Sequence, residues 1–277
     1  MRGNFIGIWS EIWVEIWLPL VSEEDVPSDI YCELYRALAP ALKEGLTPEQ
    51  LADIIDNPTQ SREKLEGTNS IEISDERHVV SFLEDVHDVL EDFGGDALSN
   101  RYFNLLKQFI EKYSLRYDLR RPCKICPTIS GMFTSLVSNI GNISRQDAHL
   151  GALLHDFEES VRDLKHGCTD GRIKTCLGKQ FMLIEAIGAS SPEINKKTLG
   201  DICDELTDWP HMAVRESLKK LYGFASDYPG IRHGGSAKGI MRGVDMRDMV
   251  AMSILLAGFT PYLSKRIDAD NVYWGQS

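Results

Sequence analysis

The sequence predicts an all-α protein, a helical bundle built in two parts. Three observations support this class: apolar residues recur with a helical period, helix-capping residues stand where these periodic segments begin, and strand patterns are scarce. The 277 residues are enough for one large domain or two small ones. A content of 43% hydrophobic and 26% charged residues is ordinary for a soluble globular protein.

The first expected helix is the near-repeat IWSEIWVEIWLP at residues 8–19. A four-residue repeat drifts by only about 40° per repeat on a helix, so its isoleucines and tryptophans share one broad apolar face. Glu11 and Glu15 lie opposite and interrupt the run, which argues against a secretory signal peptide or a basic interfacial membrane helix. We therefore expect this face to pack in the core or at a subunit interface.

Four more helices are expected in the N-terminal region, over residues 28–45, 47–56, 75–94 and 99–119. Ser28 is the expected cap of the first, and Thr47 followed by Pro48 gives the second a strong start. Gly94 is expected to close the third. The stretch NSIEIS at 69–74 is the best candidate for a strand.

A boundary is expected in RRPCKICPTISG, residues 120–131, where basic residues, prolines and a glycine cluster. It divides the chain into an N-terminal helical region, 1–120, and a second helical domain, 121–277. Helices are expected in the second part over roughly 132–141, 145–166, 170–188, 198–207, 211–226 and 244–265. The last begins at Asp245, and its run MVAMSILLAGFTPYL predicts a central core helix.

No run of 18 apolar residues exists, so no membrane span is expected. A cytoplasmic location follows, in which the six cysteines are reduced thiols. Cys123 and Cys126 form a C-x-x-C pair, and together with Cys168 and Cys176 they could supply the four ligands of a structural zinc ion. Because the second spacing is atypical, we predict neither metal nor cofactor and keep zinc as the weaker alternative.

The glycine-rich loop after residue 228 is the main candidate for chemistry. Residues 215–243 hold six basic residues but only two acidic ones, in a chain of net charge −12. Arg232 and His233 are the candidate catalytic residues, because arginine stabilises charge on a phosphodiester and histidine transfers protons. The candidate nucleic-acid contacts are Lys219, Lys220, Lys238 and Arg242. The alternative is a solvated basic loop in which Arg232 pairs with a carboxylate such as Asp245 or Asp248.

The segment LYGFASDYPGIRHGGSAKGIMRGVDMRDMVAMSILLAGFTPYLS, residues 221–264, resembles the C-terminal part of HEPN-type helical domains of bacterial abortive-infection proteins. The shared pattern is a helix, an "IRH-G" loop and an apolar helix. The resemblance implies a small helical bundle, a homodimer or a subunit of a hetero-complex, and in many members a metal-independent ribonuclease. Arg232 matches the signature arginine, and His233 matches the polar position after it.

The downstream histidine of the HEPN signature is absent, because residues 236–238 read Ser-Ala-Lys. Three outcomes remain open: His233 takes over proton transfer, Lys238 supplies charge stabilisation only, or the site is inactive. An upstream acidic residue often completes such sites, and Asp156, Glu158 and Glu159 are the candidates. The resemblance thus implies an antiphage defence protein that cleaves RNA through residues 215–243. The alternative is an inactive scaffold, dimerisation or nucleic-acid-sensing subunit of a larger defence complex.

Overall fold

The computed structural model describes residues 3–22, 26–236 and 238–274 and confirms the all-α class. Over these residues the chain forms helices, loops and one two-stranded hairpin. Among them, no helix combines the length and the apolar character needed to cross a membrane. The chain divides into two compact units, unit 1 with residues 1–135 and 270–277, and unit 2 with residues 136–269.

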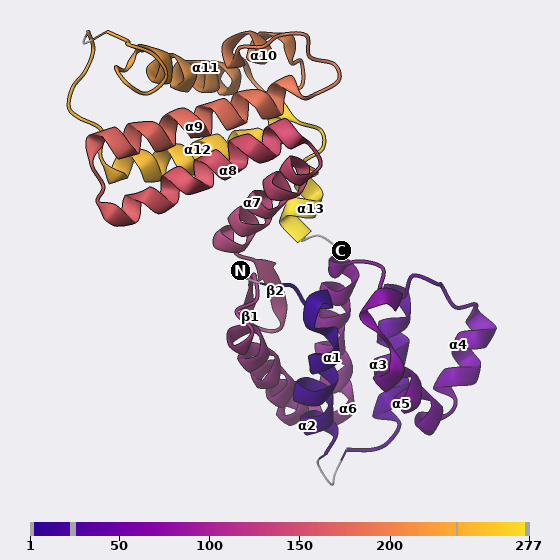
Figure 1. Ribbon diagram of the computed structural model, residues 1–277. Coiled ribbons are helices and arrows are strands. Elements are labelled where there is room, and N and C mark those ends of the chain that lie inside the picture. Colours follow the sequence, from indigo (N-terminus) through magenta and orange to yellow (C-terminus); the bar gives the residue numbers. More distant parts are fainter. Residues whose placement is uncertain (1–2, 23–25, 237, 275–277) are drawn as a thin grey trace. The chain divides into compact units, whose positions relative to one another are not determined.

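Unit 1 holds the elements before residue 128, together with the last turn of the chain (Figure 1). Its helices and strands are η1 (Ile6–Ile8), α1 (Trp9–Ile12), η2 (Trp13–Trp17), α2 (Leu18–Val21), α3 (Ile30–Leu38), η3 (Ala39–Ala41), α4 (Pro48–Ile55), α5 (Pro58–Gly67), η4 (Ser70–Glu72), α6 (Glu76–Lys112), β1 (Tyr117–Arg120) and β2 (Lys124–Pro127). Helix α7 (Ile129–Arg145) begins in unit 1 and ends in unit 2, and α13 (Ala269–Trp274) returns the chain to unit 1.

The N-terminal repeat forms four consecutive short helices, η1, α1, η2 and α2, and continues past Pro19, where the sequence predicted its end. The reason is the turn η2, a π-helix in which the Leu18 N–H donates to the Trp13 carbonyl. In an α-helix the ring of Pro19 would collide with the carbonyl four residues earlier, whereas a widened turn leaves room for it.

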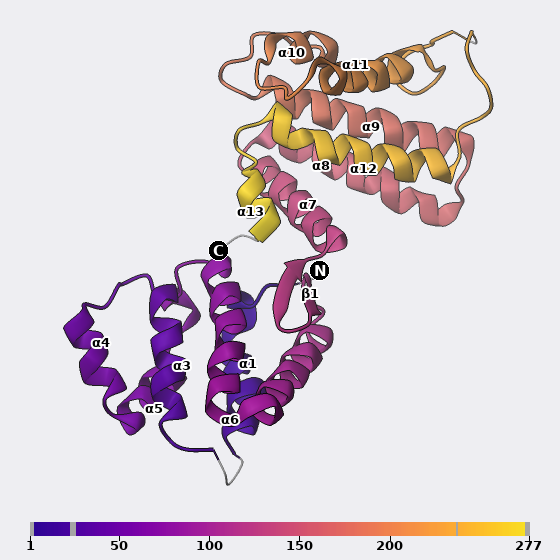
Figure 2. The ribbon, with the colours of Figure 1, turned by 180° about the vertical axis from the view of Figure 1, so that it is seen from behind.

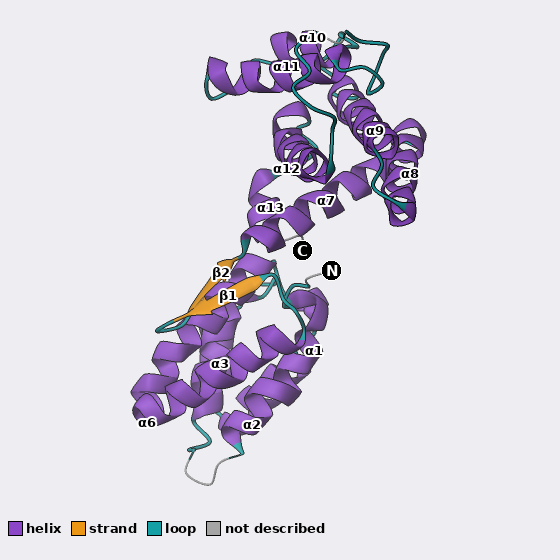
Figure 3. Cartoon of the chain, turned by 90° about the vertical axis from the view of Figure 1, so that its left-hand side faces the viewer, coloured by secondary structure: helices purple, strands orange, loops and turns teal. Residues whose placement is uncertain are grey.

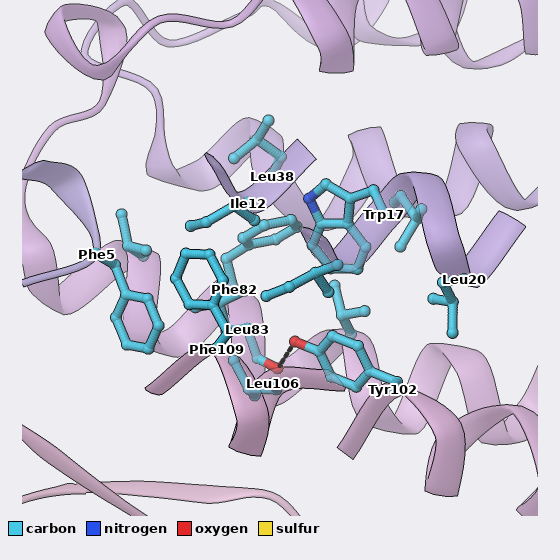
Figure 4. Packing of buried hydrophobic residues seen from close by; sticks show 14 of the residues in the cluster. Phe5, Ile12, Trp17, Leu20, Leu38, Phe82, Leu83, Tyr102, Leu106 and Phe109 are labelled. Carbon is cyan, nitrogen blue, oxygen red and sulfur yellow. Dashed lines mark hydrogen bonds between the residues drawn. The ribbon is translucent and has the colours of Figure 1, made fainter. Parts of the chain in front are cut away.

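The apolar face of this segment is buried in unit 1, as the helical period predicts. Ile12 and Ile16 are fully buried, and Trp17 is 2% exposed. Figure 4 shows Trp17 among the rings of Phe82 and Tyr102, with centroids 5.7 and 5.5 Å away. The Tyr102 hydroxyl donates to the Leu83 carbonyl, so its polar end is satisfied inside the core. The repeat is therefore a core element.

Helix α6 contains the two helices predicted over 75–94 and 99–119, joined across a kink, and the second one ends at Lys112 rather than 119. It bends at Gly95, whose φ of 62° and ψ of −164° lie outside the helical region and require a glycine. The Asp75 carboxylate caps its start by accepting from the His78 N–H. The first residue of the helix, Glu76, is fully buried and accepts hydrogen bonds from the Phe5 and Ile6 N–H groups.

Residues 69–74 do not form the predicted strand. They form the 3-10 turn η4, with a single bridge between Leu42 and Ile73. The hairpin of β1 and β2 lies instead in the segment expected to be a boundary, with Tyr117 opposite Pro127 and Arg120 opposite Lys124 (Figure 3). This hairpin belongs to unit 1, which extends to residue 135.

One of the two predicted N-caps is present, and the predicted start of the last apolar helix at Asp245 is confirmed. Thr47 and Gln50 form a capping box at α4, and Asp245 and Asp248 form one at α12 (Met246–Leu263). Ser28 is not the cap of α3, which starts at Ile30 and ends at Leu38 rather than near Gly45. Pro40 accounts for the early end, since proline cannot continue an α-helix.

Unit 2 is built around one buried helix, α9 (Asp170–Ala189), flanked by α8 (Ala148–Asp163) and α12 (Figures 1 and 2). On its other side pack α10 (Leu199–Glu205) and α11 (Met212–Asp227), and η5 (Leu164–His166) follows α8. The core side chains of α9 are Ile173, Leu177, Phe181, Leu183, Ile184 and Ile187.

Helix α12 is not the central core helix that its apolar run predicted. It buries one face, with Leu256 and Leu263 fully covered, but leaves Val250, Ile254 and Leu255 between 45% and 55% exposed. Figure 2 shows this helix in front of α8 and α9, with no helix of unit 2 over its outer side. An apolar run around the whole helix cannot tell a central helix from one whose outer face lacks a partner.

Candidate functional site in the glycine-rich loop

The loop between α11 and α12 is tightly folded against α9 at its start. Gly230 and Gly235 have φ values of 82° and 56°, which side chains rarely allow. The Ser236 N–H donates to the Asp227 carbonyl, 2.8 Å away, and closes the turn. A Cβ at Gly178 of α9 would lie only 2.4 Å from the Ile231 carbonyl oxygen. These glycines bring the loop close to the helix and thereby place Arg232.

Arg232 points into unit 2 and forms an ion pair with Glu185 of α9. Its Nη2 lies 3.1 Å from Glu185 Oε1, and the two side chains are 12% and 19% exposed. The other carboxylate oxygen accepts from the Leu199 N–H at the start of α10, 2.9 Å away. The Arg232 guanidinium carbon lies 4.4 Å from the centroid of the Tyr222 ring on α11. Arg232 thus connects the loop to three helices.

Little of the Arg232 guanidinium can reach a ligand. Its Nη1 is buried and has no hydrogen-bond partner in the described structure. Burial raises the pKa of the neighbouring Tyr222 hydroxyl, with the Arg232 hydrogen bond acting against that shift and Glu185 acting with it. A phosphate could contact this guanidinium only after the loop moved or Glu185 withdrew.

His233 lies next to Arg232 but is exposed. Its carbonyl accepts from the Gly230 N–H, 3.0 Å away, while its imidazole forms neither a hydrogen bond nor an ion pair with a described residue. The two candidate catalytic residues are therefore neighbours in sequence that occupy different environments, one in the protein and one in solvent.

Besides Arg232, three other basic residues of the 215–243 segment form ion pairs with carboxylates. Lys219 lies 2.8 Å from Asp204, and its hydrogen bond lowers the pKa of that carboxyl. Arg242 lies 2.6 Å from Asp248 and likewise lowers the pKa of that carboxyl. Arg215 contacts Glu216 and Asp204. Lys220 and Lys238 are the exposed lysines of the segment without an acidic partner in the described part of the chain.

The carboxylate that reaches Arg232 is none of those suggested by the sequence. Glu158 and Glu159 pair with Arg162, and Asp156 lies 3.5 Å from Lys179. Asp248 and Asp245, proposed as partners of Arg232, pair with Arg242 instead. The sequence does hold one signal for Glu185, the single charged residue in the apolar run FMLIEAIGA.

The four cysteines considered for zinc are divided between the units. Cys123 and Cys126 belong to unit 1, whereas Cys168 and Cys176 belong to unit 2. Burial raises the pKa of Cys123 to about 12 and also raises that of Cys176, which keeps both as thiols. Among the described residues, the metal-capable group is His87 with Asp88 and Glu91, and none of the four cysteines belongs to it.

Comparison of the chain with models of known protein families, with curated proteins and with solved structures found no match.

Proposed function

We propose that the protein is a non-catalytic scaffold subunit of a bacterial defence assembly, cytoplasmic, whose unit 2 forms a homodimer through the exposed face of α12. Of the two functions that the HEPN-like resemblance implies, we favour the catalytically inactive scaffold. It is supported by the state of Arg232, whose guanidinium is engaged by Glu185 and Tyr222 rather than open to RNA.

The observation that carries the proposal is the outer face of α12. Val250, Ile254, Leu255 and Tyr262 are 53%, 55%, 45% and 39% exposed on one side of one helix. Scattered exposed apolar residues are normal, but a contiguous stripe of them is typical of an interaction surface. The stripe carries no acidic residue, and Arg247 at its start is the one charged residue on it.

A second copy of the chain is the partner that fits this stripe. About a point between Ile254 and Leu255, these exposed positions of the helix match in size: Ala251 corresponds to Gly258, and Arg247 corresponds to Tyr262. An antiparallel pair around a two-fold axis would therefore oppose large with large and small with small. Ala251 and Gly258 are exposed and let two helices approach closely. Arg247 would meet the ring of Tyr262 in the second copy.

Oligomeric mass tests this proposal. We expect wild-type protein to be a dimer in sedimentation equilibrium and Leu255→Glu to be a monomer, because a charge at the axis would be buried unpaired twice. Met212→Glu is the matched control, since Met212 is 67% exposed on α11, outside the stripe, and should remain dimeric. The dimer proposal would be refuted if wild-type protein stayed monomeric when its concentration was raised about 100-fold. A dimeric Leu255→Glu variant would refute it as well.

A ribonuclease is the second candidate, because Lys220, His233 and Lys238 are exposed and unpaired by carboxylates in the described structure. The two lysines could contact RNA phosphates, with His233 as the proton-transfer residue. The discriminating variant is His233→Ala, whose exposed side chain can be removed without disturbing packing. Arg232→Ala is less informative, since it leaves the Glu185 carboxylate half-buried without its partner.

The scaffold proposal predicts no cleavage of single-stranded RNA by wild-type protein in EDTA, and equal growth of bacterial cells that express wild type or His233→Ala. RNA cleavage by wild type that His233→Ala abolishes, at unchanged helical circular dichroism, would replace the scaffold by the nuclease. If wild type and His233→Ala cleaved RNA equally, both the scaffold proposal and the assignment of proton transfer to His233 would be wrong.

A further inference from the structure

Unit 1 contains a pocket of about 350 Å³ beside the N-terminal helices. Its aromatic wall is Trp9, Trp13 and Trp17, which come from successive turns of the repeat. A polar wall comes from the end of α5, the residues after it and the turn η4, and contributes Glu66, Thr68, Asn69 and Ser70. The volume is at the small end of ligand sites and suits one long side chain rather than a nucleotide.

The tryptophans are held in place by the fold. Trp9 donates its indole N–H to the Thr68 carbonyl, 2.8 Å away, so its polar edge is already used. Trp17 is fixed by stacking on Tyr102, with an angle of 8° between the rings. Trp13 starts the π-helical turn and is partly exposed. Widened π turns are frequent at functional sites, because they redirect side chains that a regular helix would place elsewhere.

The polar wall of the pocket carries one charge, the carboxylate of Glu66. Glu66 is exposed and has neither an ion pair nor a hydrogen bond to a described residue. The neighbouring acids of the N-terminal helices are engaged, Glu15 with Lys112 and Tyr113, and Glu11 with Ser10. No lysine, arginine or histidine is among the residues that line the pocket.

The net negative charge of the molecule comes from unit 1. Unit 1 holds 13 basic and 25 acidic residues, a net charge of −12, whereas unit 2 holds 17 of each and is neutral. A field of this sign attracts cationic partners to unit 1 and repels nucleic acids and anionic membranes. Indole rings attract cations to their faces, and a carboxylate strengthens that attraction.

We infer that this pocket binds the side chain of an arginine in a basic segment of a partner polypeptide, with the guanidinium between the tryptophan wall and Glu66. Arginine suits the pocket better than lysine, because its planar guanidinium stacks on aromatic rings and forms a fork that matches a carboxylate. The surrounding negative field selects a partner segment with several positive charges.

The test uses the full chain and a fluorescein-labelled peptide of four Arg-Gly repeats, with fluorescence anisotropy as the readout. A peptide of four citrulline-Gly repeats is the neutral control of nearly identical shape. The variants are Glu66→Gln and Trp13→Leu. The matched control is Glu63→Gln, one helical turn earlier on α5, which removes the same charge from unit 1 but does not line this pocket.

We expect Glu66→Gln and Trp13→Leu to weaken binding of the arginine peptide about 5- to 10-fold each, and Glu63→Gln to change it less than about 2-fold. The citrulline peptide should bind at least about 10-fold more weakly than the arginine peptide. If Glu66→Gln and Glu63→Gln had equal effects, the negative field of unit 1 alone would explain the binding, and the proposed pocket site would be wrong. Absent binding, or equal binding of both peptides, would overturn it as well.

Discussion

Single side chains determine which parts of the glycine-rich loop can reach a ligand. The Nη2 of Arg232 pairs with Glu185, and the face of its guanidinium lies over the Tyr222 ring. Its positive charge is therefore paired within unit 2. His233, one residue later, is exposed. A half-buried ion pair of this kind fixes geometry more than it adds stability, because desolvation offsets much of the attraction. In the structure, Arg232 thus holds the loop against α9 and α11.

Glu76 is a buried carboxylate that anchors the start of the chain. It accepts from the Phe5 N–H at 2.7 Å, the Ile6 N–H at 3.0 Å and the Tyr117 hydroxyl at 2.9 Å. Burial raises its pKa to about 7, against the opposing effect of these hydrogen bonds and of Arg116. Between pH 4.5 and 7 the folded chain therefore holds a proton that the unfolded chain releases.

The sign of the resulting pH dependence follows from linkage. The folded state binds more protons than the unfolded state across this window, so the free energy of unfolding falls as pH rises from 4.5 to 7, by roughly 3 kcal/mol at most. Glu76→Gln lacks this titration and, although less stable overall, should show a flatter profile. Urea unfolding at pH 5, 6, 7 and 8 measures the difference between the two proteins. Parallel profiles would mean that Glu76 titrates alike in both states.

At the scale of elements, the contact between α9 and the glycine-rich loop depends on Gly178. Gly178→Ala places a methyl group against the Ile231 carbonyl and should push the loop away from α9, separating Arg232 from Glu185. We expect destabilisation of about 1–3 kcal/mol, as for other overpacked sites. Gly223→Ala in α11 is the control, since nothing lies within 4 Å of its added methyl and alanine favours a helix.

Denaturant unfolding followed by circular dichroism measures both glycine variants. Gly223→Ala should equal or exceed wild type in stability. If Gly178→Ala were as stable as wild type, the close approach of Ile231 to α9 would not constrain the loop.

The elements also show how far local sequence patterns reach. The capping residue Thr47 predicted the start of α4, because a cap acts on neighbouring N–H groups and needs no distant partner. The pattern failed at NSIEIS, where alternating apolar residues resembled a strand but formed a 3-10 turn with one bridge. A strand exists only where a second strand pairs with it, and the pairing formed instead between residues 117–120 and 124–127.

At the scale of the whole molecule, charge is divided unequally between the two units. The net charge of −12 belongs to unit 1, and the basic segment of unit 2 is balanced by its own acidic residues, including Asp204, Glu185 and Asp248. The sequence showed a local reversal of charge at 215–243 but not the carboxylates that meet it in space. The division favours a cationic partner for unit 1 and an apolar partner for α12 of unit 2.

The all-α class, the buried Ile/Trp face of the N-terminal helices and the N-cap of α4 could be predicted from the amino-acid sequence alone. These features follow from residues within a few positions of one another. Two features depend on contacts between distant parts of the chain: Arg232 pairs with Glu185, 47 residues earlier, and α9 rather than α12 is the central helix of unit 2. An apolar run indicates that a helix has apolar surface to bury. Which side of the helix is buried and which remains exposed depends on the elements that pack against it.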